Sequence, residues 1–225
     1  MCLKICPMES KPQKSNNLFR ESSIAFLGFS IFDMIHIIVA SHVLVYAYSQ
    51  RPIMEMDAAS SAVELSFSFL LILYIVSMIR RHKEAARVRR NFSFCHLIAS
   101  LSVFLPATFL IPEVVHGDWG TVHETTEWVM VIVYAVLAFL SVVLYAVAQL
   151  VDERTPGGLE WRIFLIIGSI VFILAAGTGV AVTVMENKFP TWLIVMDCIG
   201  KAGPIVPAIL TIWRLTRKAE STDLY

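Results

Sequence analysis

Charged residues are scarce in this chain of 225 residues, and the few that occur are grouped in short connecting segments. Only 16% of the residues are Asp, Glu, Lys or Arg, whereas a soluble domain has about 25%. The formal net charge is zero, so nothing predicts an attraction to nucleic acid. The composition therefore disfavours both a soluble globular domain and a nucleic-acid-binding protein.

Cysteine is equally sparse. The four cysteines, Cys2, Cys6, Cys95 and Cys198, are too few and too dispersed for a disulfide framework. Cys2 and Cys6 are candidates for palmitoylation beside a membrane, which the sequence does not decide.

Recognisable catalytic motifs are missing too. The chain has no Cys-x-x-Cys, phosphate-binding loop or Ser-His-Asp set, and its histidines fall at different expected depths. We therefore expect no enzyme, no metal site and no cofactor.

Apolar residues are abundant and form long blocks. They make up 57% of the chain, and the mean hydropathy is +0.70. A spanning helix needs about 20 mostly apolar residues. The blocks do not alternate at period two, and open strand edges cannot exist in lipid. The sequence predicts an all-α, polytopic bundle of six transmembrane helices, over residues 23–49, 58–79, 92–111, 127–151, 161–185 and 190–213.

The connectors between these blocks predict the orientation. Fifteen of the eighteen Lys and Arg residues lie in the N-terminal segment, the connectors 80–90 and 152–162, and the C-terminal tail. The opposite connectors hold only Arg51 and Lys188. Because cytoplasmic connectors are enriched in Lys and Arg, both termini are expected in the cytoplasm.

Three parts of the chain follow from this topology. Residues 1–22 are expected to be a disordered cytoplasmic segment, 23–213 the six-helix transmembrane domain, and 214–225 a cytoplasmic tail. The first apolar block is too long for a cleavable signal peptide and is expected to remain as a signal anchor. Tryptophans are expected at the membrane interfaces, namely Trp128, Trp161, Trp192 and Trp213.

A charged side chain at mid-bilayer costs roughly 2.5–3.5 kcal/mol on insertion scales, so it needs a partner or a role. Asp197 and Lys201 lie four residues apart in the sixth block, on one helical face, and are expected to pair. Gly203 and Pro204 are expected to kink this helix. The pair is either a structural salt bridge or part of a ligand or ion site.

A retinal Schiff base on Lys201 is a further interpretation. The stretch 197–201 resembles the last helix of microbial rhodopsins, in which a lysine holds retinal and an aspartate one turn earlier is its counter-ion. Those proteins have seven helices and an arginine in the third, whereas this chain is expected to have six, without an arginine in residues 92–111. The comparison therefore disfavours retinal binding.

Other polar residues fall inside the first two blocks. Asp33 and His36 share a face of the first helix, and Glu64 lies in the second. They are either polar contacts within the bundle or, with Asp197 and Lys201, the lining of a small transporter or channel. In the acidic external loop 112–127, His116 and His123 could sense pH or bind a cation, although simple hydration explains them as well.

The layout resembles the DRAM family, the damage-regulated autophagy modulators. The shared features are six helices, cytoplasmic termini, a basic connector after the second helix, Val122-His123 before the fourth, and Asp197 in the last. Other family stretches are absent: residues 50–58 read QRPIMEMDA where the family has Ser-Asp-Thr-Gly and Pro-Pro-Glu-Ser.

The resemblance implies a non-enzymatic role in modulating autophagy, trafficking or membrane lipid organisation. It also implies a lysosomal, endosomal or plasma membrane location. The expected partners are the lipid bilayer and other membrane proteins or further copies of the chain, and no nucleic acid.

Overall fold

The computed structural model describes residues 85–115, 124–185 and 191–220, together with isolated positions between 24 and 76. Within these residues every regular element is an α-helix, which confirms the all-α prediction. The isolated positions inside the first two predicted spans are helical as well. The rest of those two spans lies outside the described residues.

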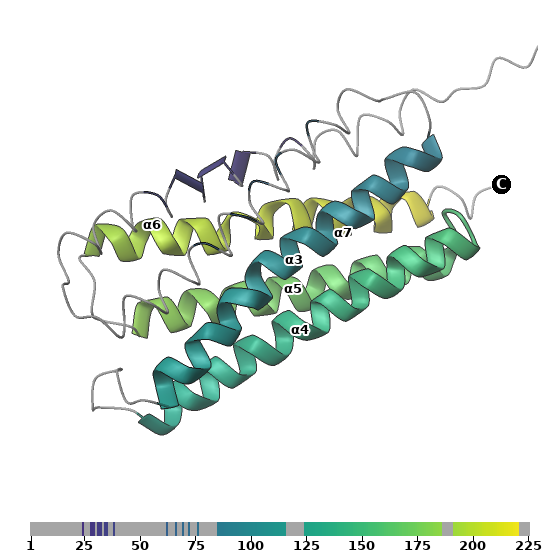
Figure 1. Ribbon diagram of the computed structural model, residues 1–225. Coiled ribbons are helices and arrows are strands. Elements are labelled where there is room, and N and C mark those ends of the chain that lie inside the picture. Colours follow the sequence, from purple (N-terminus) through teal and green to yellow (C-terminus); the bar gives the residue numbers. More distant parts are fainter. Residues whose placement is uncertain are drawn as a thin grey trace, which may run out of the picture.

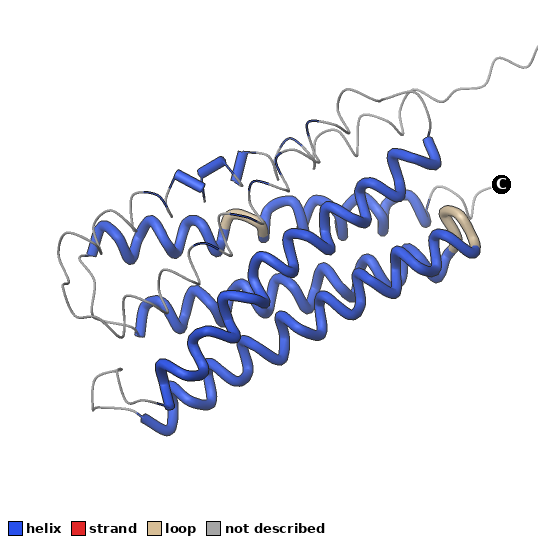
Figure 2. Tube along the Cα trace, viewed as in Figure 1, coloured by secondary structure: helices blue, strands red, loops and turns tan. Residues whose placement is uncertain are grey.

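Five helices form the described bundle. They run lengthwise beside one another, and the last two follow each other along one side (Figure 1). A short loop separates these two, and another joins the fourth helix to the fifth (Figure 2). The elements are α3 (Ala85–Val115), α4 (Glu124–Arg154), α5 (Leu159–Met185), α6 (Thr191–Ala202) and α7 (Ile205–Glu220).

Four stretches of the described chain are long and apolar enough to cross a membrane. At about 1.5 Å per residue, the 31 residues of α4 exceed the roughly 30 Å of a bilayer's hydrocarbon core. These findings support an integral membrane protein, whereas the count of six spans and the orientation stay predictions. The four stretches are Phe92–Ile111, Thr125–Arg154, Leu159–Met185 and Ile194–Arg217.

Two helices extend beyond their predicted limits. Helix α3 begins at Ala85, so the second half of the basic connector 80–90 is helical. Helix α7 continues to Glu220, so the predicted tail begins as a helix. Both extensions are rich in Arg, Ala, Lys and Glu, which have high helix propensity. A prediction based on hydropathy ends a span at such residues because they are charged or only weakly apolar.

Apolar side chains lie both inside the bundle and on its outside. Several serine and threonine side chains are buried between the helices, whereas large apolar side chains cover the outside. An apolar exterior of this extent fits a lipid environment, in which small polar residues join helices. The exposed apolar residues of α4 include Val129, Val136, Phe139 and Leu150.

Two tyrosines of α4 pack against two glycines of α5. A Cβ atom at Gly168 would lie 3.0 Å from the Tyr145 ring, and one at Gly179 would lie 2.9 Å from the Tyr134 ring. The tyrosines are eleven residues apart in α4, as are the glycines in α5, and eleven residues make about three helical turns. This repeat aligns the two antiparallel helices along their length.

The loop between α4 and α5 is closed by one carboxylate. Asp152, which is 5% exposed, accepts a 2.8 Å hydrogen bond at Oδ1 from the backbone N–H of Gly157. Gly157 has a φ of 71°, a conformation that glycine adopts without steric cost. The chain therefore reverses in a tight turn at Pro156-Gly157-Gly158.

Candidate functional site

The last span is interrupted where the sequence predicts a kink. Helix α6 ends at Ala202 and α7 begins at Ile205. Pro204 has no N–H and cannot bond the carbonyl of Gly200, so the helical ladder stops. The backbone N–H of Gly203 still bonds Ile199 O at 2.8 Å, and that of Val206 bonds Gly203 O at 3.1 Å.

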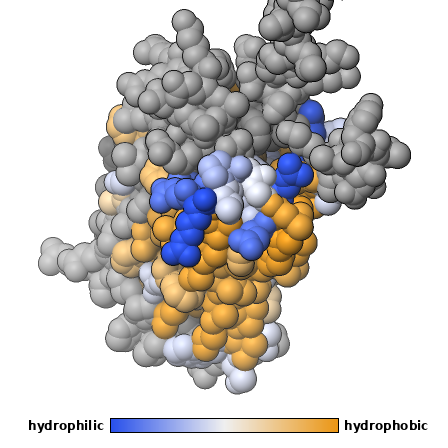
Figure 3. Space-filling model, turned by 90° about the vertical axis from the view of Figure 1, so that its right-hand side faces the viewer, coloured by the Kyte–Doolittle hydropathy of each residue, from blue (hydrophilic) through white to orange (hydrophobic). Residues whose placement is uncertain are grey.

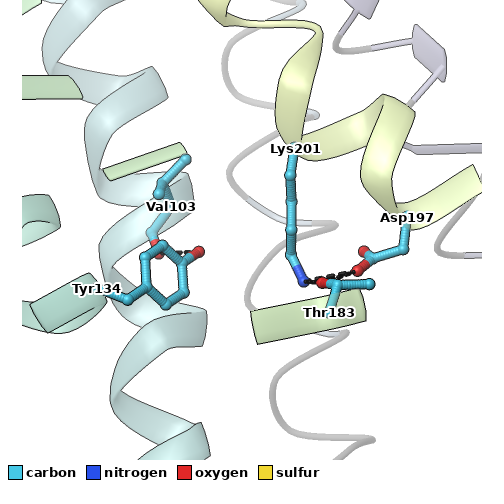
Figure 4. A network of polar contacts seen from close by, with 5 residues as sticks. All are labelled: Val103, Tyr134, Thr183, Asp197 and Lys201. Carbon is cyan, nitrogen blue, oxygen red and sulfur yellow. Dashed lines mark hydrogen bonds and ion pairs between the residues drawn. The ribbon is translucent and has the colours of Figure 1, made fainter. Parts of the chain in front are cut away.

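A polar cluster, Thr183–Asp197–Lys201, lies one turn before this interruption. Lys201 Nζ is 2.6 Å from Asp197 Oδ2, so the predicted ion pair is present. Lys201 Nζ also donates to Thr183 Oγ1 at 2.6 Å, and the Thr183 hydroxyl donates to Asp197 Oδ2 at 2.6 Å. The three side chains converge between α5 and α6 (Figure 4).

The charges of the Thr183–Asp197–Lys201 cluster are stabilised in three ways. The two opposite charges reduce the cost of placing either one in a membrane. Lys201 stands in the last turn of α6, where a cation is favoured by the helix dipole. Thr183, 5% exposed, ties both charges to α5. The Lys201 and Asp197 side chains are 23% and 27% exposed, so the pair is only partly enclosed.

A second contact lies across the bundle from this cluster. The Tyr134 hydroxyl donates to the carbonyl oxygen of Val103 at 3.3 Å and joins α4 to α3 (Figure 4). The same hydroxyl oxygen would be 3.2 Å from a Cβ atom at Gly179. Gly179 is one turn before Thr183 in α5, so both contacts depend on the position of one stretch of that helix.

His96 is a buried titratable group of α3, at 1% exposure. Its Nδ1 lies 3.0 Å from the carbonyl oxygen of Phe92, and its Nε2 lies 3.0 Å from Thr211 Oγ1 in α7. The Thr211 hydroxyl also lies 2.8 Å from the Pro207 carbonyl oxygen. The imidazole therefore joins α3 to α7. The sequence predicts at what depth His96 lies in the membrane. It does not predict the contact with Thr211, because no spacing in α3 indicates a partner 115 residues away.

Aromatic rings surround His96. The Phe92 and His96 ring centroids are 4.4 Å apart, and those of His96 and Tyr145 are 5.2 Å apart, both edge to face. The Tyr145 hydroxyl donates to Ser169 Oγ at 3.1 Å. The rings shield the imidazole from lipid while the polar atoms join neighbouring helices.

Trp161, which the sequence predicts at a membrane interface, lies in the first turn of α5 and is 2% exposed. Its indole therefore faces other helices and not the outside of the bundle. Its Nε1–H donates to Ser93 Oγ at 2.8 Å, so the polar end of the buried ring has a partner. Trp192 and Trp213, at 48% and 43% exposure, face outward, as an interfacial anchor would.

Five other residues were predicted from the sequence as site residues. Asp33, His36, Glu64, His116 and His123 lie outside the described residues. The described residues therefore bring together only Asp197 and Lys201 from the predicted set, and add Thr183 to them. Across the part of the chain that the structure describes, no three His, Cys, Asp or Glu side chains are grouped to hold a metal ion.

The retinal interpretation also concerns this cluster. Lys201 Nζ, the nitrogen that a Schiff base would use, donates to Asp197 and Thr183. The carboxylate one turn before the lysine is present, as that interpretation expects. Retinal binding stays a prediction.

Comparison of the chain with known protein families, with curated protein sequences and with solved structures finds no match. The resemblance to the DRAM family therefore stays a prediction. The class of the protein, an integral membrane protein, is therefore supported by its own structure: the described part of the helical bundle holds four candidate membrane spans.

Proposed function

We propose that this protein is a non-enzymatic membrane protein that modulates autophagy, trafficking or lipid organisation in a lysosomal, endosomal or plasma membrane. In this proposal it crosses the bilayer six times with both termini in the cytoplasm. The charge distribution and the DRAM-like layout of the sequence support the proposal. It would act through its apolar outer surface, in contact with lipid or with other membrane proteins.

One observation carries this proposal: polar side chains inside the bundle join one helix to another. Thr183 joins α5 to α6 through Asp197, and His96 joins α3 to α7 through Thr211. Trp161 joins α5 to α3 through Ser93. Contacts of this kind hold transmembrane helices together. These interhelical contacts support a structural role for the polar interior. In this proposal the outer surface of the bundle is the part that contacts other molecules.

The test compares cells that lack the chain with cells that express it. Autophagic flux and bilayer order, reported by a polarity-sensitive membrane dye, are measured together. We expect the wild-type chain to change at least one of them, and a Gly179→Leu variant, which disrupts the bundle, to change neither. Unaltered readouts with the wild type would refute the proposal, as would a purified protein that turns over a substrate.

The interrupted span favours a second candidate, a small transporter or channel. Transporter sites are commonly formed by discontinuous helices near the bilayer midplane. Lys201 lies in the last turn of α6 before the break at Gly203 and Pro204, and its partner Asp197 lies one turn earlier. Asp33, His36 and Glu64 would line the remaining path in this proposal.

The transporter proposal is tested with proteoliposomes that contain a trapped pH- or cation-sensitive dye. Asp197→Asn and Lys201→Met should each abolish the flux. Thr216→Val serves as the control, because the Thr216 hydroxyl is exposed and bonds only the backbone of its own helix, at 2.9 Å from Ile212 O and 3.0 Å from Trp213 O. Absence of any proton or cation flux in the wild type would exclude this candidate.

A further inference from the structure

Helix α7 carries an outward stripe of four side chains, Val206, Ile209, Trp213 and Arg217. Their spacing of three, four and four residues places them on one face. Val206, Ile209 and Trp213 are 46%, 51% and 43% exposed, and Arg217 is exposed at the end of the stripe. The residues that α7 buries in the bundle are others, among them Ala208, Thr211 and Leu215.

Two guanidinium groups are positioned by the tryptophan of this stripe. The Arg217 Cζ atom lies 4.3 Å from the centroid of the Trp213 ring, and the Arg214 Cζ atom lies 5.1 Å from it. A cation over an indole is attracted by the negative face of the ring. Arg217 is exposed to the outside of the bundle. Its N–H groups can therefore reach an anion at the surface.

The position of the stripe along the span matches the depth of a lipid headgroup. The last candidate span ends at Arg217, and tryptophan prefers the boundary between hydrocarbon and water. This end of α7 is also the end of the bundle that holds the α4–α5 turn (Figure 1). Figure 3 views this end and shows polar residues gathered beside a broad apolar surface.

We propose that the α7 stripe binds one anionic phospholipid. An acyl chain lies along Val206 and Ile209, the Trp213 ring packs at the glycerol level, and the headgroup phosphate meets Arg217. A guanidinium group matches a phosphate through two parallel N–H···O bonds. This inference goes beyond the proposed function and requires only that the last span lies in a bilayer.

The experiment uses the purified full chain in phosphatidylcholine nanodiscs. These contain equal small fractions of either brominated phosphatidylserine or brominated phosphatidylcholine, because bromine on an acyl chain quenches a nearby indole. The chain has five tryptophans, so the signal of Trp213 is obtained by subtracting that of a Trp213→Phe variant. We expect stronger quenching by the anionic lipid in the wild type.

Arg217→Gln should reduce the preference for the anionic lipid about fivefold, the factor that one surface cation contributes. Arg154→Gln is the matched control, since Arg154 is an exposed arginine at the same end of the bundle, in α4. It should leave the preference unchanged.

Three results would overturn the proposal. Equal quenching by the two lipids in the wild type would show no headgroup selection. An equal loss in Arg154→Gln would show a diffuse effect of surface charge. Displacement of the lipid by millimolar inorganic phosphate would show a site for small anions.

Discussion

Tyr134 occupies the space that a side chain at position 179 would need: a Cβ atom there would lie 2.9 Å from the tyrosine ring. The second pair, Tyr145 and Gly168, repeats this contact at 3.0 Å. Each glycine permits α4 and α5 to approach closely, as small residues do between transmembrane helices. The register of the two helices therefore depends on the absence of a side chain at Gly168 and at Gly179.

Replacing either glycine by alanine should destabilise the bundle. Gly168→Ala and Gly179→Ala force a buried ring to move, and overpacking of this kind costs typically about 1–3 kcal/mol. Gly177→Ala is the control, because no atom outside its own helix lies within 4 Å of its Cβ position. Thermal unfolding of the detergent-solubilised protein measures all three. A Gly179→Ala variant as stable as Gly177→Ala would contradict the packing described.

The Thr183–Asp197–Lys201 cluster predicts a coupled pair. Lys201→Met or Asp197→Asn alone leaves a partner without its main contact, which costs about 1–3 kcal/mol. The double variant should lose less than the sum, because neither unpaired group remains. Unfolding midpoints of the four proteins give the coupling. Simple additivity would show that the pair contributes nothing to stability.

The same double variant separates a structural pair from a transport site. If the pair only stabilises the packing of α6 against α5, the double variant should regain flux to the extent that it regains stability. If Asp197 and Lys201 carry ions or protons, the double variant is stable but has no flux in proteoliposomes. A stable double variant that retains full flux would remove these two residues from any transport path.

Thr211→Val should weaken the contact between α3 and α7. The change keeps the volume but places a methyl group against Nε2 of the buried His96, and an unsatisfied buried polar group costs about 1–3 kcal/mol. Thr216→Val, on the same helix, removes only an exposed bond to the backbone. The difference between their unfolding midpoints measures the contribution of the interhelical bond, and equal midpoints would contradict it.

The orientation is open to chemical labelling. In a chain whose Cys2 and Cys6 are serine, Pro156→Cys in the α4–α5 turn should react with an impermeant maleimide only after the cells are permeabilised. Thr191→Cys, exposed at the other end of the bundle, should react in intact cells that carry the chain in the plasma membrane. The opposite pattern would reverse the predicted topology.

Hydropathy located the last four predicted spans because lipid imposes a length on every crossing helix, whatever its partners. The interruption of the last span was also predictable, since Pro204 cannot donate a backbone hydrogen bond. So was the pairing of Asp197 with Lys201, which depends only on helical spacing within one segment.

Contacts between helices were not predictable in the same way. Nothing near Thr183 in the sequence indicates Asp197 as its partner, and nothing near His96 indicates Thr211. Trp161 shows the limit most clearly: its place at a span end predicts the depth of the ring, whereas its burial against Ser93 depends on another helix. Such partners are determined by how helices pack, and a hydropathy profile contains no such information.

The interruption at Gly203 and Pro204 gives one crossing segment two separate attachments. The α6 half is fastened to α5 by Thr183, and the α7 half is fastened to α3 by His96. Because the backbone hydrogen-bond ladder stops between these two attachments, α7 can change its tilt relative to α6 without first breaking the Asp197–Lys201 pair.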